Sequence, residues 1–91
     1  MTAAEERAFL RALGGCVRVV RLDRGLSQEQ LAETSGLSPQ FVCQLERGSH
    51  GANVVNLLRV AEALRVPLAV LLDEAADPSP VPEGRSESVG D

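Results

Sequence analysis

The sequence predicts an all-α fold: a compact domain of five helices, followed by a disordered acidic tail. Three observations support this class. Apolar residues recur at helical spacing, capping residues stand where helices would begin, and no alternating strand pattern occurs. The 91 residues suffice for one small domain, and they include no tryptophan, no tyrosine and only two phenylalanines. The core is therefore expected to consist mainly of Leu, Val and Ala side chains.

The first helix is predicted over residues 3 to about 24. Thr2 and Glu5 have the spacing of a capping box. The apolar residues that follow recur on one helical face, namely Phe9, Leu10, Leu13, Val17 and Val20. Gly14 and Gly15 weaken the middle of this helix, because each glycine costs about 1 kcal/mol relative to alanine. A kink there, or a separate helix start near Gly15, is the alternative to one continuous helix.

The second and third helices are predicted within RGLSQEQLAETSGLSPQFVCQLERG, residues 24–48. Ser27 with Gln30 fits a second capping box, and Ser38 with Pro39 places an N-cap and a first-turn proline before the next helix. Gly36 provides the left-handed turn between helices at about 28–35 and 39–47. Two short capped helices joined by a glycine turn are typical of a helix-turn-helix, here residues 27–48, which presents its second helix to the DNA major groove.

Two further helices complete the predicted domain. Asn53 can cap the fourth, whose inward stripe is Leu57, Val60, Ala61 and Leu64. Pro67 opens a short fifth helix with more apolar residues than one buried face needs. We therefore predict a two-fold dimer through a dimerisation region at 54–72, with an interface that includes Leu68, Val70 and Leu72.

The charge is divided unevenly between this domain and the tail. Residues 1–72 carry 8 Arg against 7 acids, whereas residues 73–91 carry 1 Arg against 6 acids. The tail also has three prolines and no periodic apolar pattern, so we expect it to be disordered from near Asp73. Its simplest role is to solvate the chain. A truncated linker, or an acidic strip that competes with phosphate for a basic face, is the alternative.

The residue inventory argues against catalysis and against bound cofactors. The chain has one histidine, no glycine-rich phosphate loop, no paired carboxylates in a plausible cleft, and two cysteines, Cys16 and Cys43, without metal-ligand spacing. We therefore expect no enzyme activity, no metal and no cofactor. No signal peptide or apolar run of membrane length is apparent, so a cytoplasmic location without a membrane partner is expected.

The third helix is predicted to carry the contacts to DNA bases. With Val42 and Leu45 facing the core, helical geometry turns Gln40, Cys43, Gln44 and Arg47 to the opposite side. Glutamine can pair with adenine through two hydrogen bonds, so Gln40 and Gln44 are the predicted base readers. Cys43 could contact a thymine methyl group or serve as a weakly polar spacer. Ser38 and Pro39, at the start of this helix, complete the predicted base-contacting set.

Phosphate contacts are predicted at the two ends of the helix-turn-helix. Gln28 stands at the start of the second helix, where free N–H groups and the helix dipole favour a phosphate oxygen. Arg47, at the end of the third helix, is the other predicted phosphate ligand.

Residues 13–72 resemble the Cro/repressor-like, or Xre-type, helix-turn-helix regulators, whose fold is that of the lambda repressor. The resemblance rests on LGGCVRVVRLDRGLSQEQLAETSGLSPQFVCQLERG followed by NLLRVAEALRVPLAVLL. It implies that Ser27 and Gln28 anchor the second helix on phosphate. It also implies that Arg21 pairs with Glu46 as a structural ion pair. Family members usually bind as dimers, and the segment SHGANV departs from the family pattern, in which a proline and often a basic residue are usual.

Together these observations predict a transcriptional regulator, a repressor or controller, that binds double-stranded DNA sequence-specifically as a homodimer. The alternative is a protein-interaction module of the same fold, such as an antitoxin or adaptor with a protein partner. The small net charge of residues 1–72 supports this alternative, because a strong basic patch is missing.

Overall fold

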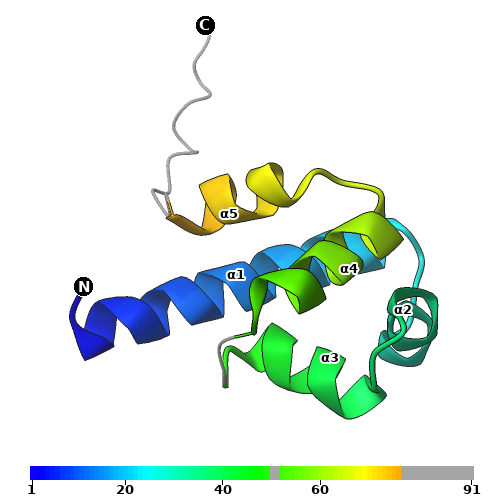
Figure 1. The fold of residues 1–91 in the computed structure, drawn as a ribbon, viewed down its shortest axis with the longest axis horizontal. Helices are drawn as coiled ribbons and strands as arrows, with labels where there is room; N and C mark the ends of the chain where they lie inside the picture. Colours follow the sequence, from blue (N-terminus) through cyan, green and yellow to red (C-terminus); the bar gives the residue numbers. More distant parts are fainter. Residues whose placement is uncertain (50–51, 77–91) are drawn as a thin grey trace, which may run out of the picture.

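The computed structural model describes residues 1–49 and 52–76. It contains the five expected helices and, within those residues, no strand (Figure 1). The helices are α1 (Ala3–Asp23), α2 (Gln28–Ser35), α3 (Pro39–Arg47), α4 (Val54–Leu64) and α5 (Leu68–Ala76). The tail is expected to be disordered, and its residues from 77 onward lie outside the described residues.

Helix α1 is continuous across its two glycines, so the alternatives of a kink or a separate start do not occur. The capping box at its start is present: Glu5 N donates to Thr2 Oγ1 at 3.1 Å, and Thr2 N donates to Glu5 Oε1 at 2.7 Å. A β-carbon at Gly14 would collide with the carbonyl oxygen of Leu45 and lie 2.6 Å from that of Glu46. This glycine therefore allows the backbones of α1 and α3 to approach closely.

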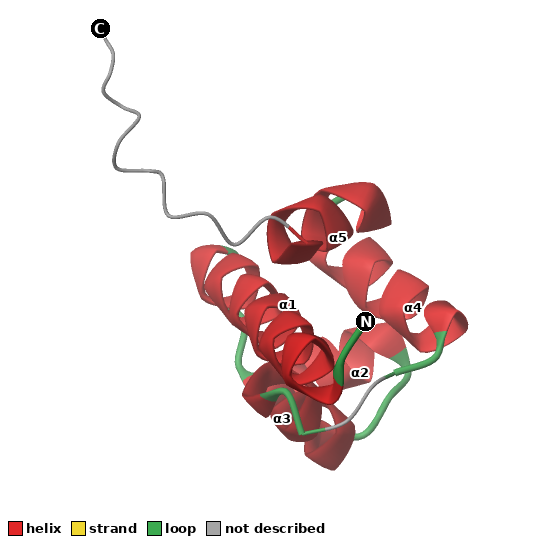
Figure 2. Ribbon diagram, turned by 90° about the vertical axis from the view of Figure 1, so that its left-hand side faces the viewer, coloured by secondary structure: helices red, strands yellow, loops and turns green. Residues whose placement is uncertain are grey.

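The core is aliphatic and lies between α1 and the other helices. In two views, α1 runs between α5 on one side and α3 on the other, and α2 packs on α3 and α4 (Figures 1 and 2). The largest fully buried side chains are all leucines and valines: Leu13, Leu31, Leu64, Leu71, Val17, Val42 and Val60. The inward faces predicted from helical spacing are thus the faces that the structure buries.

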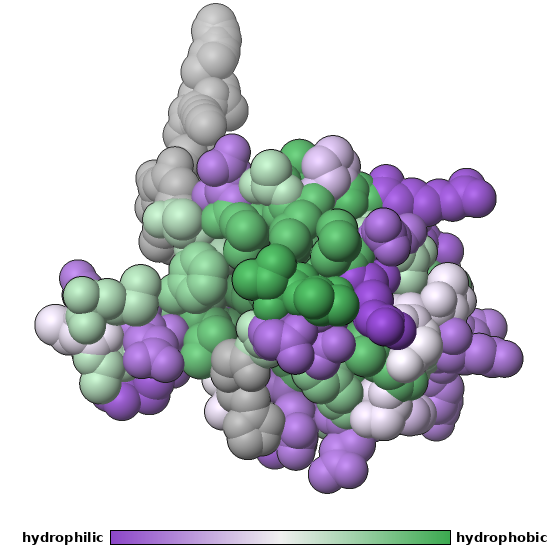
Figure 3. Space-filling model, viewed as in Figure 1, coloured by the Kyte–Doolittle hydropathy of each residue, from purple (hydrophilic) through white to green (hydrophobic). Residues whose placement is uncertain are grey.

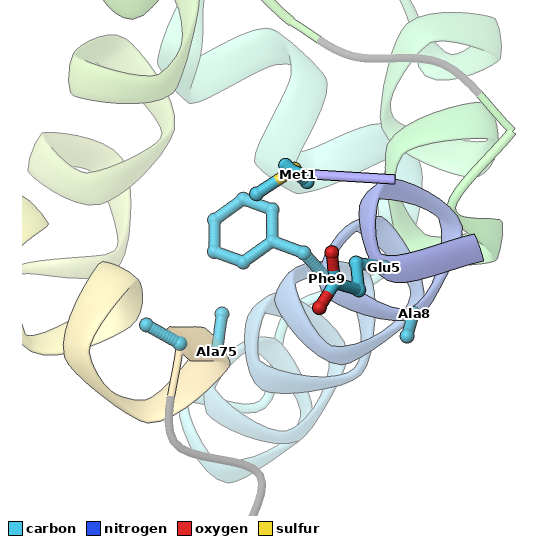
Figure 4. A pocket seen from close by; sticks show the side chains of 6 residues that line it. Met1, Glu5, Ala8, Phe9 and Ala75 are labelled. Carbon is cyan, nitrogen blue, oxygen red and sulfur yellow. The ribbon is translucent and has the colours of Figure 1, made fainter. Parts of the chain in front are cut away.

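Helix α5 continues to Ala76, four residues beyond the expected domain boundary at 72. The physical reason is that Ala75 is buried, with only 2% of its surface exposed. It lies beside an open pocket of about 630 Å³, where the ring of Phe9 projects into the space between α1 and α5 (Figure 4). The last turn of α5 is therefore part of the domain.

Two of the three residues predicted for the dimer interface are more covered than expected. Leu68 and Leu72 are half-buried against the core of the same chain. Only Val70, 42% exposed, remains open to solvent. Because α1 and α4 both pack on α5, its apolar excess is largely satisfied within the monomer.

Candidate nucleic-acid interface

The helix-turn-helix is built from local caps at both helix starts and left-handed glycines at both ends. Gln30 N donates to Ser27 Oγ, and Phe41 N donates to Ser38 Oγ, each at 3.0 Å. Gly36 and the glycine after α3 adopt φ angles of 75° and 72°, a region that favours glycine. The sequence therefore sets the bounds of α2 and α3 almost without help from distant residues.

Helix α3 buries one face and presents the other. Val42, Leu45 and Glu46 are buried, whereas Gln40 and Arg47 are exposed. Between the exposed pair, Cys43 and Gln44 are half-buried, and Ser38 and Pro39 are exposed at the helix start. The structure thus brings all the predicted base-contacting side chains together on one surface of α3.

The ion pair between Arg21 and Glu46 is present and buried. Arg21 Nε donates to Glu46 Oε2 at 2.5 Å and Arg21 Nη2 donates to Glu46 Oε1 at 3.0 Å, which makes the contact bidentate. Only 8% and 2% of the two side chains are exposed. The hydrogen bond to Glu46 raises the pKa of Arg21, and burial opposes this effect. A third donor, Arg21 Nη1, reaches the Leu26 carbonyl at 2.8 Å, so one guanidinium joins α1, the α1–α2 loop and α3.

Gln28 also belongs to this network, which sequence reasoning missed. Its Nε2 donates to Glu46 Oε1 at 3.1 Å, and its side chain is half-buried. The first residue of α2 is thereby tied to the next-to-last residue of α3. No local pattern predicts this bond, because its two residues are 18 positions apart and meet only when the two helices cross.

Two other arginines have partners that the sequence did not indicate. Arg24 Nε donates to the Leu64 carbonyl at 2.9 Å, which satisfies an end carbonyl of α4. Arg47 Nη1 lies 3.8 Å from Cys43 Sγ, one turn earlier on the exposed face of α3. Arg47 therefore stays on the surface that the glutamines occupy.

Both cysteines are free thiols. Burial, followed by the nearby Glu74 carboxylate, raises the pKa of Cys16. Across residues 1–49 and 52–76, no three His, Cys, Asp or Glu side chains form a metal-binding cluster. None of the helices in that part of the chain is long and apolar enough to cross a membrane.

Comparison with known proteins places this architecture in a family. The helix-turn-helix family model matches residues 17–71, which is more than half of the chain. A HTH-type transcriptional regulator of Sinorhizobium fredii, y4dJ, is 40% identical over 47 residues, which are 52% of this chain and 61% of that protein. The regulator MT0491 of Mycobacterium tuberculosis is 35% identical over 80 residues, which are 86% of this chain and 57% of that protein. The chain thus spans less than two thirds of the length of these two relatives.

Solved structures show the same fold. The clp gene regulator ClgR from C. glutamicum has a TM-score of 0.72 at 36% identity, over 80% of this chain and 95% of ClgR. The restriction-modification controller protein C.AhdI from Aeromonas hydrophila has a TM-score of 0.67 at 40% identity, over 68% of this chain and 94% of C.AhdI. Both proteins are named as regulators of genes or of restriction-modification. The chain therefore belongs to the Xre-type helix-turn-helix family of DNA-binding transcriptional regulators.

Proposed function

We propose that this protein represses or controls transcription by inserting α3 into the DNA major groove at a specific sequence. The observation that carries the proposal is the exposed face of α3, where Gln40, Gln44 and Arg47 lie opposite the buried Val42 and Leu45. The names of ClgR and C.AhdI, a gene regulator and a controller protein, support the regulatory role.

Sequence recognition is assigned to the middle and start of α3. Gln40 and Gln44 lie four positions apart, so their amides project from one helical face and could each pair with an adenine edge. Cys43 lies on the same face, where its sulfur could contact a thymine methyl group. Ser38 and Pro39 begin the helix at the groove edge and limit how closely the bases approach.

Backbone binding is assigned to the start of α2 and the end of α3. The Gln28 amide has two N–H donors, of which one is directed to Glu46. The second donor is available for a phosphate oxygen, beside the free backbone N–H groups that follow Ser27 at the helix start. Arg47 supplies a charged contact at the other end. In this arrangement the buried Glu46 holds Gln28, which is one of the phosphate ligands, and α3, which carries Glu46, contacts the bases.

The active unit is proposed to be a two-fold dimer formed mainly through α4. Val54, Val55 and Leu58 are 70%, 59% and 44% exposed. An apolar surface lies over α4 and α5 in Figure 3. On α5, Val70 is exposed, whereas Leu68 and Leu72 are half-buried. A dimer of this kind would place two copies of α3 about 34 Å apart, the length of one DNA turn.

The test begins with selection of duplexes from a random pool, followed by salt titrations on the selected duplex and a scrambled one. We expect Gln44→Ala to weaken binding to the selected duplex by about 1–3 kcal/mol and to leave the scrambled duplex nearly unaffected. Gln40→Ala should act in the same direction with a smaller effect. Arg47→Ala should instead weaken binding to both duplexes and lower the salt slope by about 0.9, because a phosphate contact carries no sequence information.

The control variant is Glu33→Gln, because Glu33 is an exposed residue of α2 that belongs neither to the proposed DNA contacts nor to the proposed dimer interface. Equal weakening of both duplexes by Gln44→Ala would refute the assignment of base contacts. If the wild type binds no duplex at low salt, the protein-interaction module becomes the better proposal.

The proposed dimer is tested by sedimentation equilibrium. The wild type should sediment as a dimer and Leu58→Glu as a monomer. A wild type that is monomeric at micromolar concentration contradicts the proposed dimer.

A further inference from the structure

Three arginines of α1 form a row that the proposed interface does not use. Arg7, Arg11 and Arg18 are exposed, and their separations of four and seven residues place them on one helical face. Within residues 1–49 and 52–76, the ion pairs are Arg21–Glu46 and Arg24–Asp23, so no carboxylate there is paired with this row.

The carboxylates of α1 do not stand beside the arginine row at the spacing that favours ion pairs on a helix. The positions three and four residues before and after each of the three arginines hold no aspartate or glutamate. Arg7 and Arg11 are four residues apart, and like charges at that spacing destabilise a helix slightly. A row of cations that repel one another and have no internal partner favours an external anion.

The row borders the same surface as the recognition helix. Gly14, between Arg11 and Arg18 on the helical face, is where α1 contacts the backbone of α3. A β-carbon at Gly48 would lie 2.8 Å from Arg11 Cα, so Arg11 sits against the C-terminal cap of α3. Arg47 directly precedes Gly48 and is exposed, so Arg11 and Arg47 both lie at the C-terminal end of α3.

Helix α1 also extends past the end of α3 (Figure 1). Its 21 residues span about 31 Å, whereas the 9 residues of α3 span about 14 Å. Arg7 is one turn further from the centre of α3 than Arg11, so it lies beyond the C-terminal end of α3. Base edges under α3 are out of its reach, and the nearest anions of a bound duplex would be backbone phosphates.

We propose that the arginine row of α1 binds phosphates of the same duplex next to the segment that α3 contacts. The row would be a second, sequence-independent contact strip that lengthens the footprint and adds to the salt dependence of binding. This inference rests on the proposed function, because the duplex must first be positioned by α3.

The test uses the full chain and two versions of the selected duplex, one ending at the sequence that selection enriches and one extended by about one helical turn at each end. We expect Arg7→Gln, Arg11→Gln and Arg18→Gln each to lower the salt slope on the extended duplex by up to about 0.9. On the short duplex, Arg7→Gln should leave the slope at the wild-type value. The matched control is Arg65→Gln, which removes the same charge from the cap of α4, outside the row. Thermal unfolding of each variant checks that the fold is retained.

The outcomes separate this inference from the proposed function. If selection enriches no sequence, the proposed function fails and the arginine strip fails with it. If the wild type binds its selected duplex but the row variants keep its salt slope, only the strip is refuted. The strip is also refuted if Arg65→Gln lowers the salt slope equally, or if the effect of Arg7→Gln does not depend on duplex length. Either result indicates that the net charge of the whole protein, and not a local contact, sets the salt slope.

Discussion

Gly14→Ala tests whether the close approach of α1 and α3 holds the recognition helix in place. The added β-carbon would collide with the Leu45 carbonyl oxygen and would lie 2.6 Å from the Glu46 carbonyl oxygen and 2.8 Å from its carbon. All three are backbone atoms, which cannot rotate aside as a flexible side chain would. Relief therefore requires that the two helices separate.

The adjacent Gly15 provides a matched control for the magnitude. A β-carbon at Gly15 meets no atom within 4 Å, and both glycines lie inside the same helix. Each substitution by alanine gains about 1 kcal/mol of helix propensity. Overpacking against a rigid neighbour costs about 1–3 kcal/mol, and we expect the upper value at Gly14 because backbone must move. Gly14→Ala should therefore lose about 2 kcal/mol, whereas Gly15→Ala should gain about 1 kcal/mol.

The assay is thermal and urea unfolding of the two variants and the wild type, followed by circular dichroism at a helical wavelength. A difference of about 3 kcal/mol corresponds to melting temperatures that differ by roughly 12–24 °C in a domain of this size. The urea m-values should stay equal if both variants unfold in two states from an equally compact fold. Equal melting temperatures for Gly14→Ala and Gly15→Ala would refute the close-approach argument.

Three further predictions can be checked in unfolding experiments. Arg65→Gly should stabilise the protein by about 0.5–1 kcal/mol. The φ angle of 62° strains the arginine by about 1–2 kcal/mol, and the greater freedom of glycine in the unfolded chain takes back about 0.5–1 kcal/mol. A variant that is no more stable than the wild type would contradict this prediction. Glu46→Ala should lower the free energy of unfolding by about 3–5 kcal/mol, because it leaves a buried guanidinium unpaired. Asp23→Ala removes one partner of an exposed pair and should lower it by less than about 1 kcal/mol. Similar losses in the two variants would refute the distinction between the two ion pairs. A chain cut after Leu72 should melt below one cut after residue 76, because only the shorter chain loses the buried Ala75.

The elements of this fold were predictable because their signals are local. The side chains of Ser27 and Ser38 bond to backbone N–H groups three residues away, and these pairs can be identified by eye in the sequence. The outer face of α3 was equally accessible, since burial of Val42 and Leu45 fixes which residues point outward. The ion pair of Arg21 with Glu46 came only from family resemblance, because its partners are 25 residues apart.

What could not be predicted depends on contacts between helices. The glycine pair in α1 was interpreted as a weakness of the helix, but Gly14 is the site where α3 packs and Gly15 faces open space. The extent of α5 was underestimated because Ala75 gains its burial from the start of α1, far away in sequence. Leu68 and Leu72 were expected at an interface because their number exceeds one helical face, yet the monomer itself covers much of them.

Both halves of α3 pack on the core, but their polar contacts differ, and this division suits a helix that must both be fixed and make contacts. Its C-terminal half is fixed by non-local contacts: the approach at Gly14, the bidentate bond from Arg21 to Glu46, and the bond from Gln28 to the same carboxylate. Its N-terminal half is fixed by the local cap of Ser38 and by the burial of Val42 in the core, and Gln40 is exposed on its outer face. A change at the fixed end should then alter the angle of the whole recognition helix, whereas a change at Gln40 should alter only the contact that it makes.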